Sequence, residues 1–349
     1  MREFYRSRRV LVTGGTGTIG LPLVARLQRL GAEVTVAALD PPEQARLLLG
    51  AGVRFVQADL TDPAACRRAT AGQDYVFNLV GIKGSVGIGV TRAASYFVPM
   101  LLFNTHMMDA AFRSGVGRYL VASSICAYPP AELQHEDDLW NGLPRQGDRY
   151  AGIAKRVAEI QGETYLHEYG WDAVRIVRPA NVYGPFDDFE PATAQVIPAL
   201  IRRMLDGEDP VHVWGDGTTV RDFIYSEDVA AGMLLALEHA RPCEAVNLGS
   251  GRPCTIREVA ECIAALIPRP PRIVWDEGKP AGDPVRLLSL ERARARLGFE
   301  PRTSLASGVA RTIAWYRAHR ELARRRTSGL DRRARAAEPC GMTVPGAAS

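Results

Sequence analysis

Short apolar runs alternate with longer stretches of helical apolar spacing through the first two-thirds of the chain. The apolar runs are typical of buried β-strands and lie at residues 8–15, 32–39, 53–60, 75–81, 118–124 and 172–184. The helical stretches between them are clearest at residues 21–30, 98–114 and 155–169. Buried strands separated by helices indicate a parallel sheet covered on both faces. The sequence therefore predicts an α/β fold with a doubly wound, Rossmann-type parallel sheet.

The pattern becomes less regular and richer in proline after about residue 186. We expect residues 1–185 to form a dinucleotide-binding domain, to which the chain returns near residues 220–250. Residues 186–318 would form mainly a smaller C-terminal substrate-binding lobe. This lobe would cover the carboxyl ends of the strands, where open α/β sheets bind their ligands.

The charge of the chain is concentrated near its C-terminal end. The net charge is +4, and residues 317–335 alone carry eight arginines against two carboxylates. The rest of the chain is nearly neutral, so the composition does not indicate a nucleic-acid-binding protein. A solvated, disordered basic tail over residues 319–349 explains this excess better than an RNA-binding or membrane-surface segment does.

The cysteines and the apolar runs exclude two further classes of protein. The six cysteines show no C-x-x-C spacing and the six histidines form no cluster, so we expect no structural metal site. The N-terminal residues lead directly into a strand and do not resemble a secretory signal. No apolar run approaches the length that spans a membrane. We therefore expect a soluble, cytoplasmic protein that is not bound to a membrane.

A glycine-rich loop joins the first strand to the first long helix. In "VLVTGGTGTIGLPLV", Gly14, Gly17 and Gly20 stand between the two elements. Glycine permits a tight turn and lets backbone amides approach a pyrophosphate at the N-terminus of the helix. The strand before the loop and the helix after it give the motif the context that a dinucleotide site requires.

The ends of the second and third strands carry the next cofactor residues. The position that would bind the adenosine ribose, about 20 residues beyond the glycines, holds Ala38 or Asp40. No arginine follows to receive a 2′-phosphate, which favours NAD and leaves NADP possible. Asp59 at the end of the third strand is placed to meet the adenine, and a helix N-cap role is the alternative.

Five motifs together carry a resemblance to a known family. "TGGTGTIG", "VASSICAYP", "YAGIAK", "RPANVYGPF" and "VWGDGTTVRDFIYSEDVA" resemble, in this order, the extended short-chain dehydrogenase/reductase superfamily. Within it the chain is most similar to nucleotide-sugar epimerases and reductases of the GDP-fucose synthase and GDP-mannose 3,5-epimerase type, over about residues 8–316.

The resemblance implies an NAD(P)-dependent epimerase that acts on a nucleotide-diphosphate sugar, favouring a GDP-sugar, through a transient 4-keto intermediate. NAD(P)H-dependent reduction of a 4-keto-6-deoxysugar is the alternative. A non-catalytic dinucleotide-binding protein is the alternative of another class. The resemblance also implies a homodimer in which the helices at 98–114 and 155–169 form the contact.

The resemblance implies a redox centre of one serine, one tyrosine and one lysine, matched here by Ser124, Tyr150 and Lys155. Tyr150 and Lys155 are five residues apart, which separates them by about 140° around an α-helix. A π-bulge would accommodate the extra residue, or Tyr150 would precede the helix. In a third alternative Ala151 takes the place of the tyrosine. We take Tyr150 as the catalytic tyrosine.

The resemblance implies that Cys126 moves a proton at a carbon beside the 4-keto group, provided that its pKa is lowered. A small buried cysteine behind the site is the alternative. The related enzymes have a histidine as the partner acid where this chain has Gln195, and glutamine cannot exchange a proton in that way. A one-base epimerase, a change at C4 alone and a plain 4-keto reductase all remain open. The Asp-Glu pair of a 4,6-dehydratase is absent from "SSICAYP".

The remaining binding residues also come from the resemblance. The cofactor set includes Thr18, Ile19, Leu60 and Pro179 beside the residues above. The substrate set is Asn181, Gln195, Arg221 and Arg286, with both arginines assigned to the pyrophosphate because the guanidinium fork matches its oxygens. Trp214 would pack near the nucleotide base or in the core of the smaller lobe.

Overall fold

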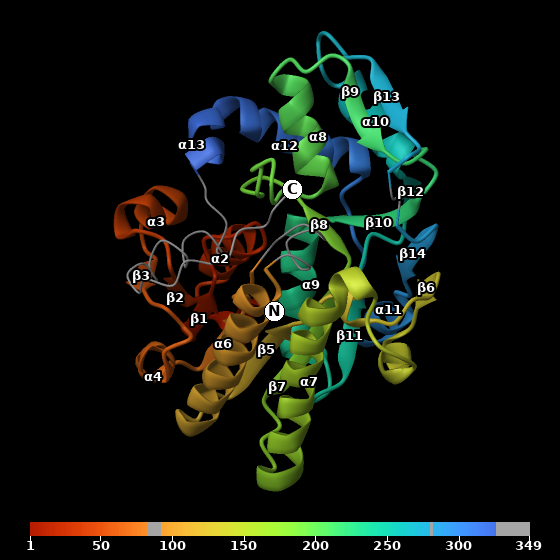
Figure 1. Ribbon diagram of the computed structural model, residues 1–349. Coiled ribbons are helices and arrows are strands. Elements are labelled where there is room, and N and C mark those ends of the chain that lie inside the picture. Colours follow the sequence, from red (N-terminus) through yellow and green to blue (C-terminus); the bar gives the residue numbers. More distant parts are fainter. Residues whose placement is uncertain (83–91, 280–281, 326–349) are drawn as a thin grey trace, which may run out of the picture.

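The computed structural model describes residues 1–82, 92–279 and 282–325. Its largest sheet has seven strands, all parallel, in the order β11-β7-β5-β4-β1-β2-β3 (Figure 1). The strands are β1 (Arg9–Thr13), β2 (Glu33–Ala38), β3 (Arg54–Gln57), β4 (Tyr75–Asn78), β5 (Arg118–Ala122), β7 (Val174–Pro179) and β11 (Ala245–Leu248). The predicted doubly wound α/β fold is confirmed.

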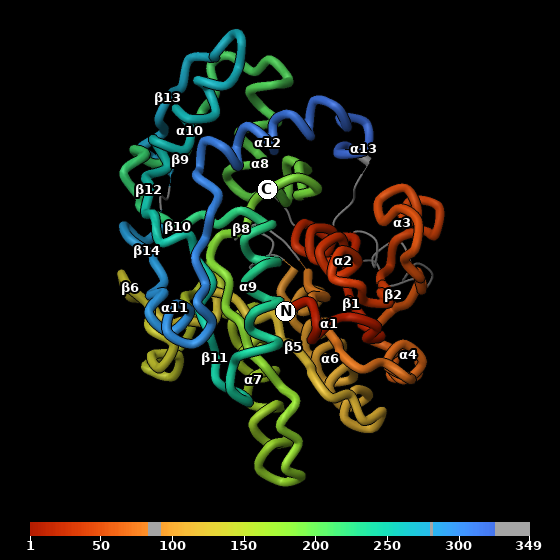
Figure 2. The backbone as a smooth tube through the Cα atoms, turned by 180° about the vertical axis from the view of Figure 1, so that it is seen from behind, coloured from red at the N-terminus to blue at the C-terminus, as the bar shows by residue number. Residues whose placement is uncertain are grey.

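Helices cover both faces of this sheet (Figures 1 and 2). One face carries α2 (Gly20–Arg29), α9 (Ser226–His239) and α11 (Glu291–Leu297), and the other carries α4 (Pro63–Thr70), α6 (Ala93–Arg113) and α7 (Arg149–Tyr169). The short helices α1 (Arg2–Tyr5) and α3 (Pro42–Leu49) complete this part of the chain. A separate apolar cluster lies under each set of helices, which is why the strands between them are apolar on both faces.

The strand order reverses between β1 and β4, because the chain winds outward from β1 to β3 and then returns to the other side of β1. At such a reversal the loops after neighbouring strands diverge and leave a crevice at their carboxyl ends. The glycine-rich loop follows β1, so it opens directly into this crevice.

The single strand predicted at residues 172–184 is wrong, since two strands form there. β7 belongs to the large sheet, and β8 (Asn181–Tyr183) pairs instead with β10 (Val220–Tyr225) of the smaller lobe. Pro179 has no N–H to continue the ladder, and the next amide, that of Ala180, makes the last bond to Leu248. The chain therefore changes sheets beside the crevice.

The smaller lobe contains a second sheet in the order β12-β10-β14-β6, with β8 beside β10, and a two-stranded sheet of β9 and β13. Its strands are β6 (Leu133–Gln134), β9 (Val211–Trp214), β12 (Pro253–Thr255), β13 (Ile273–Asp276) and β14 (Val285–Leu288). The helices α8 (Val196–Leu205), α10 (Ile256–Ala265) and α12 (Leu305–Ala318) share its apolar core. Strand β6 comes from the first half of the chain, so the chain passes between the two lobes more than once.

The first residues of the expected basic tail form a helix. Residues Arg320–Arg325 form helix α13, whose Ala323 is buried in the core of the smaller lobe. Arg320 and Arg324 both pair with Asp206, which gives part of the excess positive charge a partner. The expectation that the chain after Ala318 adds little to the fold is therefore wrong for this helix. Residues 326–349 of the expected tail lie outside the described residues.

A buried ion pair joins the large sheet to α7. Nη2 of Arg178 on β7 lies 2.6 Å from Oε2 of Glu159, and the two side chains are 4% and 3% exposed. Arg178 also donates to the hydroxyl of Tyr128 and to the carbonyl of Glu136, and Glu159 accepts from the hydroxyl of Ser123. One network thus holds β7, α7 and the loop after β5 together.

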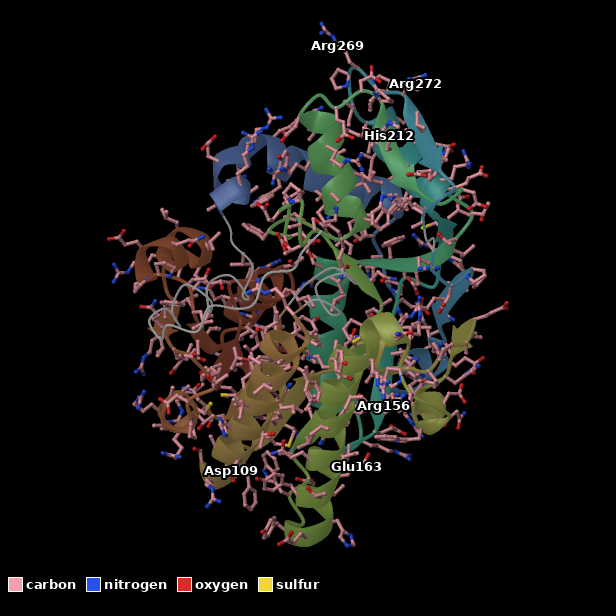
Figure 3. All side chains as sticks on the ribbon, viewed as in Figure 1. Asp109, Arg156, Glu163, His212, Arg269 and Arg272 are labelled. Carbon is pink, nitrogen blue, oxygen red and sulfur yellow. The ribbon has the colours of Figure 1, made fainter. Side chains whose placement is uncertain are left out.

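We predict that replacing Arg178 by methionine lowers the free energy of unfolding by about 3–5 kcal/mol, because the carboxylate of Glu159 would stay buried without its partner. Urea denaturation followed by circular dichroism measures this loss. Arg113→Met is the matched control, since Arg113 pairs with Asp109 on the exposed side of α6 (Asp109 is labelled in Figure 3). A control variant as unstable as Arg178→Met would contradict the special role of the buried pair.

Candidate functional site

A cleft of about 460 Å³ lies at the carboxyl ends of the large sheet, between the two lobes. Its volume is within the range of small-molecule and cofactor sites. Residues that follow β1, β2, β4, β5 and β7 line one side, and residues of β8, the start of α8 and β14 line the other. The cleft brings together most of the residues that the sequence marks as functional. They are Gly14, Gly17, Thr18, Ile19, Gly20, Asp40, Ser124, Cys126, Lys155, Pro179, Asn181, Gln195 and Arg286.

The glycine-rich loop needs its glycines for two different reasons. Gly14 has a φ of 63°, in the left-handed region that favours glycine. A Cβ on Gly20 would lie 2.6 Å from the carbonyl oxygen of Gly14, so no larger residue fits where α2 meets the loop. The loop therefore keeps its backbone open to the cleft at the N-terminal end of a helix, and it fits the pyrophosphate of a dinucleotide.

Asp40 lies where the ribose of a bound dinucleotide is expected. It follows β2 by two residues, is 3% exposed and lines the cleft. The hydroxyl of Thr16 donates to its Oδ2 atom at 2.7 Å, which fixes the orientation of the carboxylate. Ala38, the other residue considered for this position, also lines the cleft but offers no polar side chain.

Asp59 and Leu60 do not line the cleft among the described residues. Oδ1 of Asp59 accepts from the amide and the hydroxyl of Thr61, so it shapes the turn before α4. The N-cap of α4 is Asp62 rather than Asp59. Leu60 is buried in the core. The adenine contact of Asp59 and the cofactor contact of Leu60 stay predictions.

Ser124, Cys126 and Lys155 meet in the middle of the cleft. Ser124 caps the short 3₁₀ helix η1 (Ile125–Ala127), and its Oγ accepts from the amide of Cys126 at 3.2 Å. Nζ of Lys155 donates to the carbonyl of Ala122 at 2.6 Å. Burial lowers the pKa of Lys155, while Cys126 and Glu159 act in the opposite direction. The Ser124 hydroxyl also forms a side-chain hydrogen bond with Cys126.

Tyr150 lies apart from these three residues. Helix α7 runs as an unbroken α-helix from Arg149, so the structure contains neither the π-bulge nor the pre-helical tyrosine that would bring Tyr150 to Lys155. The side chain is 42% exposed, and its ring lies 6.0 Å from that of Phe97. Ala151, four residues before Lys155, lines the cleft instead. The catalytic role of Tyr150 stays a prediction, and the third alternative matches the observed helix.

The environment of Cys126 opposes a thiolate. Burial raises the pKa of the thiol, and the nearby carboxylate of Asp148 raises it further. The hydrogen bond with Ser124 and the charges of Arg286 and Lys155 lower it by less. The thiol is therefore protonated at neutral pH, whereas the expected base requires a lowered pKa.

The polar side chains of the smaller lobe form the far end of the cleft. Nδ2 of Asn181 donates to the carbonyl of Asp222 at 2.9 Å, and Gln195 stands at the N-terminus of α8. Arg286 is bonded through Nη1 to Asp148 at 2.8 Å and through Nη2 to the carbonyl of Ile125. Asn181, Gln195 and Arg286 all line the cleft while they make these contacts.

Arg221 stands behind Arg286 rather than in the cleft wall. It donates to the carbonyl of Asp283, while Arg145 pairs with the Asp283 carboxylate at 2.7 Å. Burial lowers the pKa of Arg221, and the neighbouring Arg145 and Arg286 lower it further. Three arginines thus make this end of the cleft positive.

One further prediction concerns Trp214, and two residues of the cleft were not predicted. Trp214 is exposed on β9, so neither its packing in the lobe core nor a place in the cleft wall is found. Tyr96 and Asp148 also line the cleft, although no motif in the sequence marks either residue. Tyr96 precedes the predicted helix at 98–114 but lies in the first turn of α6, and Asp148 directly precedes α7. For Asp148, the available signal in the sequence was a polar residue directly before a predicted helix.

Residues 1–82, 92–279 and 282–325 contain neither a metal-binding cluster nor a membrane-spanning helix. No group of three or more His, Cys, Asp and Glu side chains is placed to hold a metal ion there. Within the same residues, no helix has the length and apolar character needed to cross a bilayer.

The chain matches known proteins over most of its length. It is 33% identical over 323 residues to the dTDP-4-dehydro-6-deoxy-D-allose reductase of Streptomyces bikiniensis, covering 90% of this chain and 98% of that protein. It is 31% identical to the GDP-L-fucose synthase of Escherichia coli K12, covering 88% and 96%. Among solved structures, a dTDP-glucose 4,6-dehydratase from Streptomyces venezuelae with bound NAD superimposes with a TM-score of 0.77 at 26% identity, covering 90% and 98%.

The sequence family described as "NAD dependent epimerase/dehydratase" matches residues 10–249. This range contains the glycine-rich loop, Asp40, Ser124, Lys155 and Asn181. The chain therefore belongs to the NAD-dependent epimerase/dehydratase family, and it is an NAD(P)-dependent enzyme of the extended short-chain dehydrogenase/reductase type.

Proposed function

We propose that the enzyme reduces the 4-keto group of a nucleotide-diphosphate sugar with NAD(P)H, and that it prefers NADH. One observation carries this proposal. A single cleft holds a glycine-rich loop and Asp40 at one end, Ser124 and Lys155 in the middle, and a positive group of side chains around Arg286 at the other. A dinucleotide, a reacting carbonyl and a diphosphate are thus each matched by residues of suitable chemistry.

The roles of the residues follow from their donors and charges. A bound nicotinamide supplies the hydride. The hydroxyl of Ser124 donates a hydrogen bond to the substrate carbonyl, and the ammonium of Lys155 stabilises negative charge that develops there. Arg286 and Asn181 bind the phosphates and the sugar, and Asp148 holds the Arg286 guanidinium in place for the diphosphate.

Epimerisation through a transient 4-keto species is the second candidate. The position of Cys126 in the cleft wall favours it, and so does the similarity to a GDP-L-fucose synthase. The raised pKa of the thiol and the presence of Gln195 favour reduction over it, because neither group removes and returns a proton readily.

We expect one equivalent of NADH to be oxidised for each 4-keto sugar converted, as measured by absorbance of the nicotinamide. dTDP- and GDP-linked 4-keto-6-deoxysugars are the substrates to compare, with the GDP-sugar expected from the sequence. Cys126→Ser should retain a kcat near that of the wild type, since loss of a catalytic base costs about 100-fold or more. A reaction that leaves NADH unchanged and stops in Cys126→Ser would favour epimerisation.

We predict that Asp40 sets the preference for NADH. Its buried carboxylate would repel the 2′-phosphate of NADPH and accept bonds from the ribose hydroxyls of NADH. Asp40→Ser should lower the ratio of kcat/KM for NADH to that for NADPH by about tenfold, or ~1.4 kcal/mol. Thr18→Ser, on the same loop but without an acidic group, should leave the ratio unchanged. An unchanged ratio in Asp40→Ser would contradict the assignment.

We also propose a homodimer that uses α6 and α7. These helices lie side by side on one face of the sheet (Figure 1). Their outer surface exposes Val98 and Leu102 from α6, and Tyr150, Val157 and Ile160 from α7. The five described cysteines are free thiols, in keeping with the cytoplasmic location that we also propose.

Val157→Glu should convert the dimer to a monomer, because a charge would be buried in an apolar contact. Multi-angle light scattering at micromolar concentration measures the mass. Leu47→Glu is the control, since Leu47 is 83% exposed on α3, away from this surface. A wild-type protein that is monomeric under these conditions would contradict the proposal.

A further inference from the structure

Reduction of a ketone needs a proton as well as a hydride. The hydride adds to the carbon, and the oxygen that becomes an alkoxide must receive a proton from a group in the cleft. Tyr150 does not line the cleft, and Ala151 presents only a methyl group beside Lys155. The source of the proton must therefore be sought among the other residues of the cleft wall.

Four nearby groups in the described cleft wall are poorly suited to this role. The ammonium of Lys155 donates to the carbonyl of Ala122, and the proposed reduction already assigns its charge to stabilising the developing alkoxide. Asp148 is a carboxylate paired with Arg286. Ser124 is an alcohol with no base behind it among the described contacts, since its Oγ accepts from the amide of Cys126. The thiol of Cys126 is a weak hydrogen-bond donor.

Tyr96 is a further titratable group of the described cleft wall, and it carries a proton that it can give. It lies in the first turn of α6 and lines the same cleft as Ser124, Cys126 and Lys155. The charged or titratable groups close enough to affect its phenol are Cys126 and Asp148, which places the ring toward the centre of the cleft. Its hydroxyl makes no hydrogen bond to any residue that the structure describes. The phenol carries its proton at neutral pH, as an ordinary tyrosine does, and burial raises its pKa further.

The packing of α6 on α7 explains why this tyrosine faces the cleft. Neighbouring residues of a helix point about 100° apart. Phe97 faces α7 and lies against Tyr150, while Tyr96, the residue before it, faces the cleft. Ala151, which lines the same cleft, carries no phenol, so α7 offers no tyrosine one helical turn before Lys155.

We propose that Tyr96 is the catalytic acid of this enzyme, an inference that rests on the proposed reduction. The O–H bond of Tyr96 breaks and a new O–H bond forms on the substrate oxygen, while the reduced nicotinamide gives its hydride to the carbon. The phenolate regains its proton from water after the product leaves. The acid thus comes from α6, and the lysine comes from α7.

Tyr96→Phe and Tyr150→Phe test the inference as a matched pair. In Tyr96→Phe the kcat for 4-keto sugar reduction should fall about 100-fold or more. Its KM, its melting temperature and its calorimetric Kd values for NADH and for a nucleoside diphosphate should stay near those of the wild type. If Tyr96 is the acid, Tyr150→Phe should keep the wild-type kcat, whereas the catalytic role that the sequence predicts for Tyr150 requires kcat to fall in that variant. Adding Ala151→Tyr to Tyr96→Phe should restore about tenfold or more of kcat, because that phenol would face the cleft one helical turn before Lys155.

The outcomes separate the inference from the proposed function. A Tyr96→Phe enzyme with wild-type kcat would overturn the inference and leave the reduction standing, as would a loss of kcat in Tyr150→Phe alone. If Tyr96→Phe binds NADH more weakly and this accounts for the whole loss of activity, the residue has a structural role. That result would also overturn the inference. A wild-type protein that reduces none of the 4-keto sugars would overturn the proposed function and, with it, the inference.

Discussion

The buried ion pair between Arg178 and Glu159 is the constraint on which the geometry of the cleft depends. Two charges in an apolar interior are stable only while each keeps the other and its hydrogen bonds. Glu159 stands one helical turn after Lys155 on α7, and it also holds Ser123, the neighbour of Ser124. The same pair therefore fixes the rotation of α7 and the path of the loop after β5. Arg156, labelled in Figure 3, adds two bonds from α7 to the carbonyls of Ala127 and Gly142.

The charges of the cleft follow from what surrounds them. At the Arg286 end of the cleft, the three arginines Arg286, Arg221 and Arg145 outnumber their carboxylate partners Asp148 and Asp283 by one. Asp148 compensates part of this charge, and its pairing with Arg286 keeps the guanidinium fixed in the wall. A ligand that carries two phosphates fits such a site, since it supplies the missing negative charge. The carboxylate that raises the pKa of Cys126 thus also belongs to the ligand-binding end of the cleft.

The sequence was sufficient for the features that local physics dictates. The strands of the large sheet are apolar because both faces are covered, and Gly14 and Gly20 are required by a positive φ and by a close backbone contact. It was insufficient where tertiary contacts decide. The apolar segment at 172–184 contains no signal strong enough to divide it between two sheets. Helix α13 depends on Asp206, a residue more than a hundred positions away.

The orientation of α7 about its axis determines which side chains face the cleft, and a shift of one residue in the spacing from Lys155 changes that choice. At 100° per residue, Ala151 lies about 40° from Lys155 around the helix, and Tyr150 lies about 140° from it. Tyr150 instead falls within about 20° of Val157, seven residues later, on the exposed apolar surface of α6 and α7. The five-residue spacing thus moves a phenol from the cleft to the surface where we place the dimer contact. Because the buried pair at Glu159 prevents α7 from turning back, the cleft must take its acid from another element, and α6 is the one that supplies a tyrosine there.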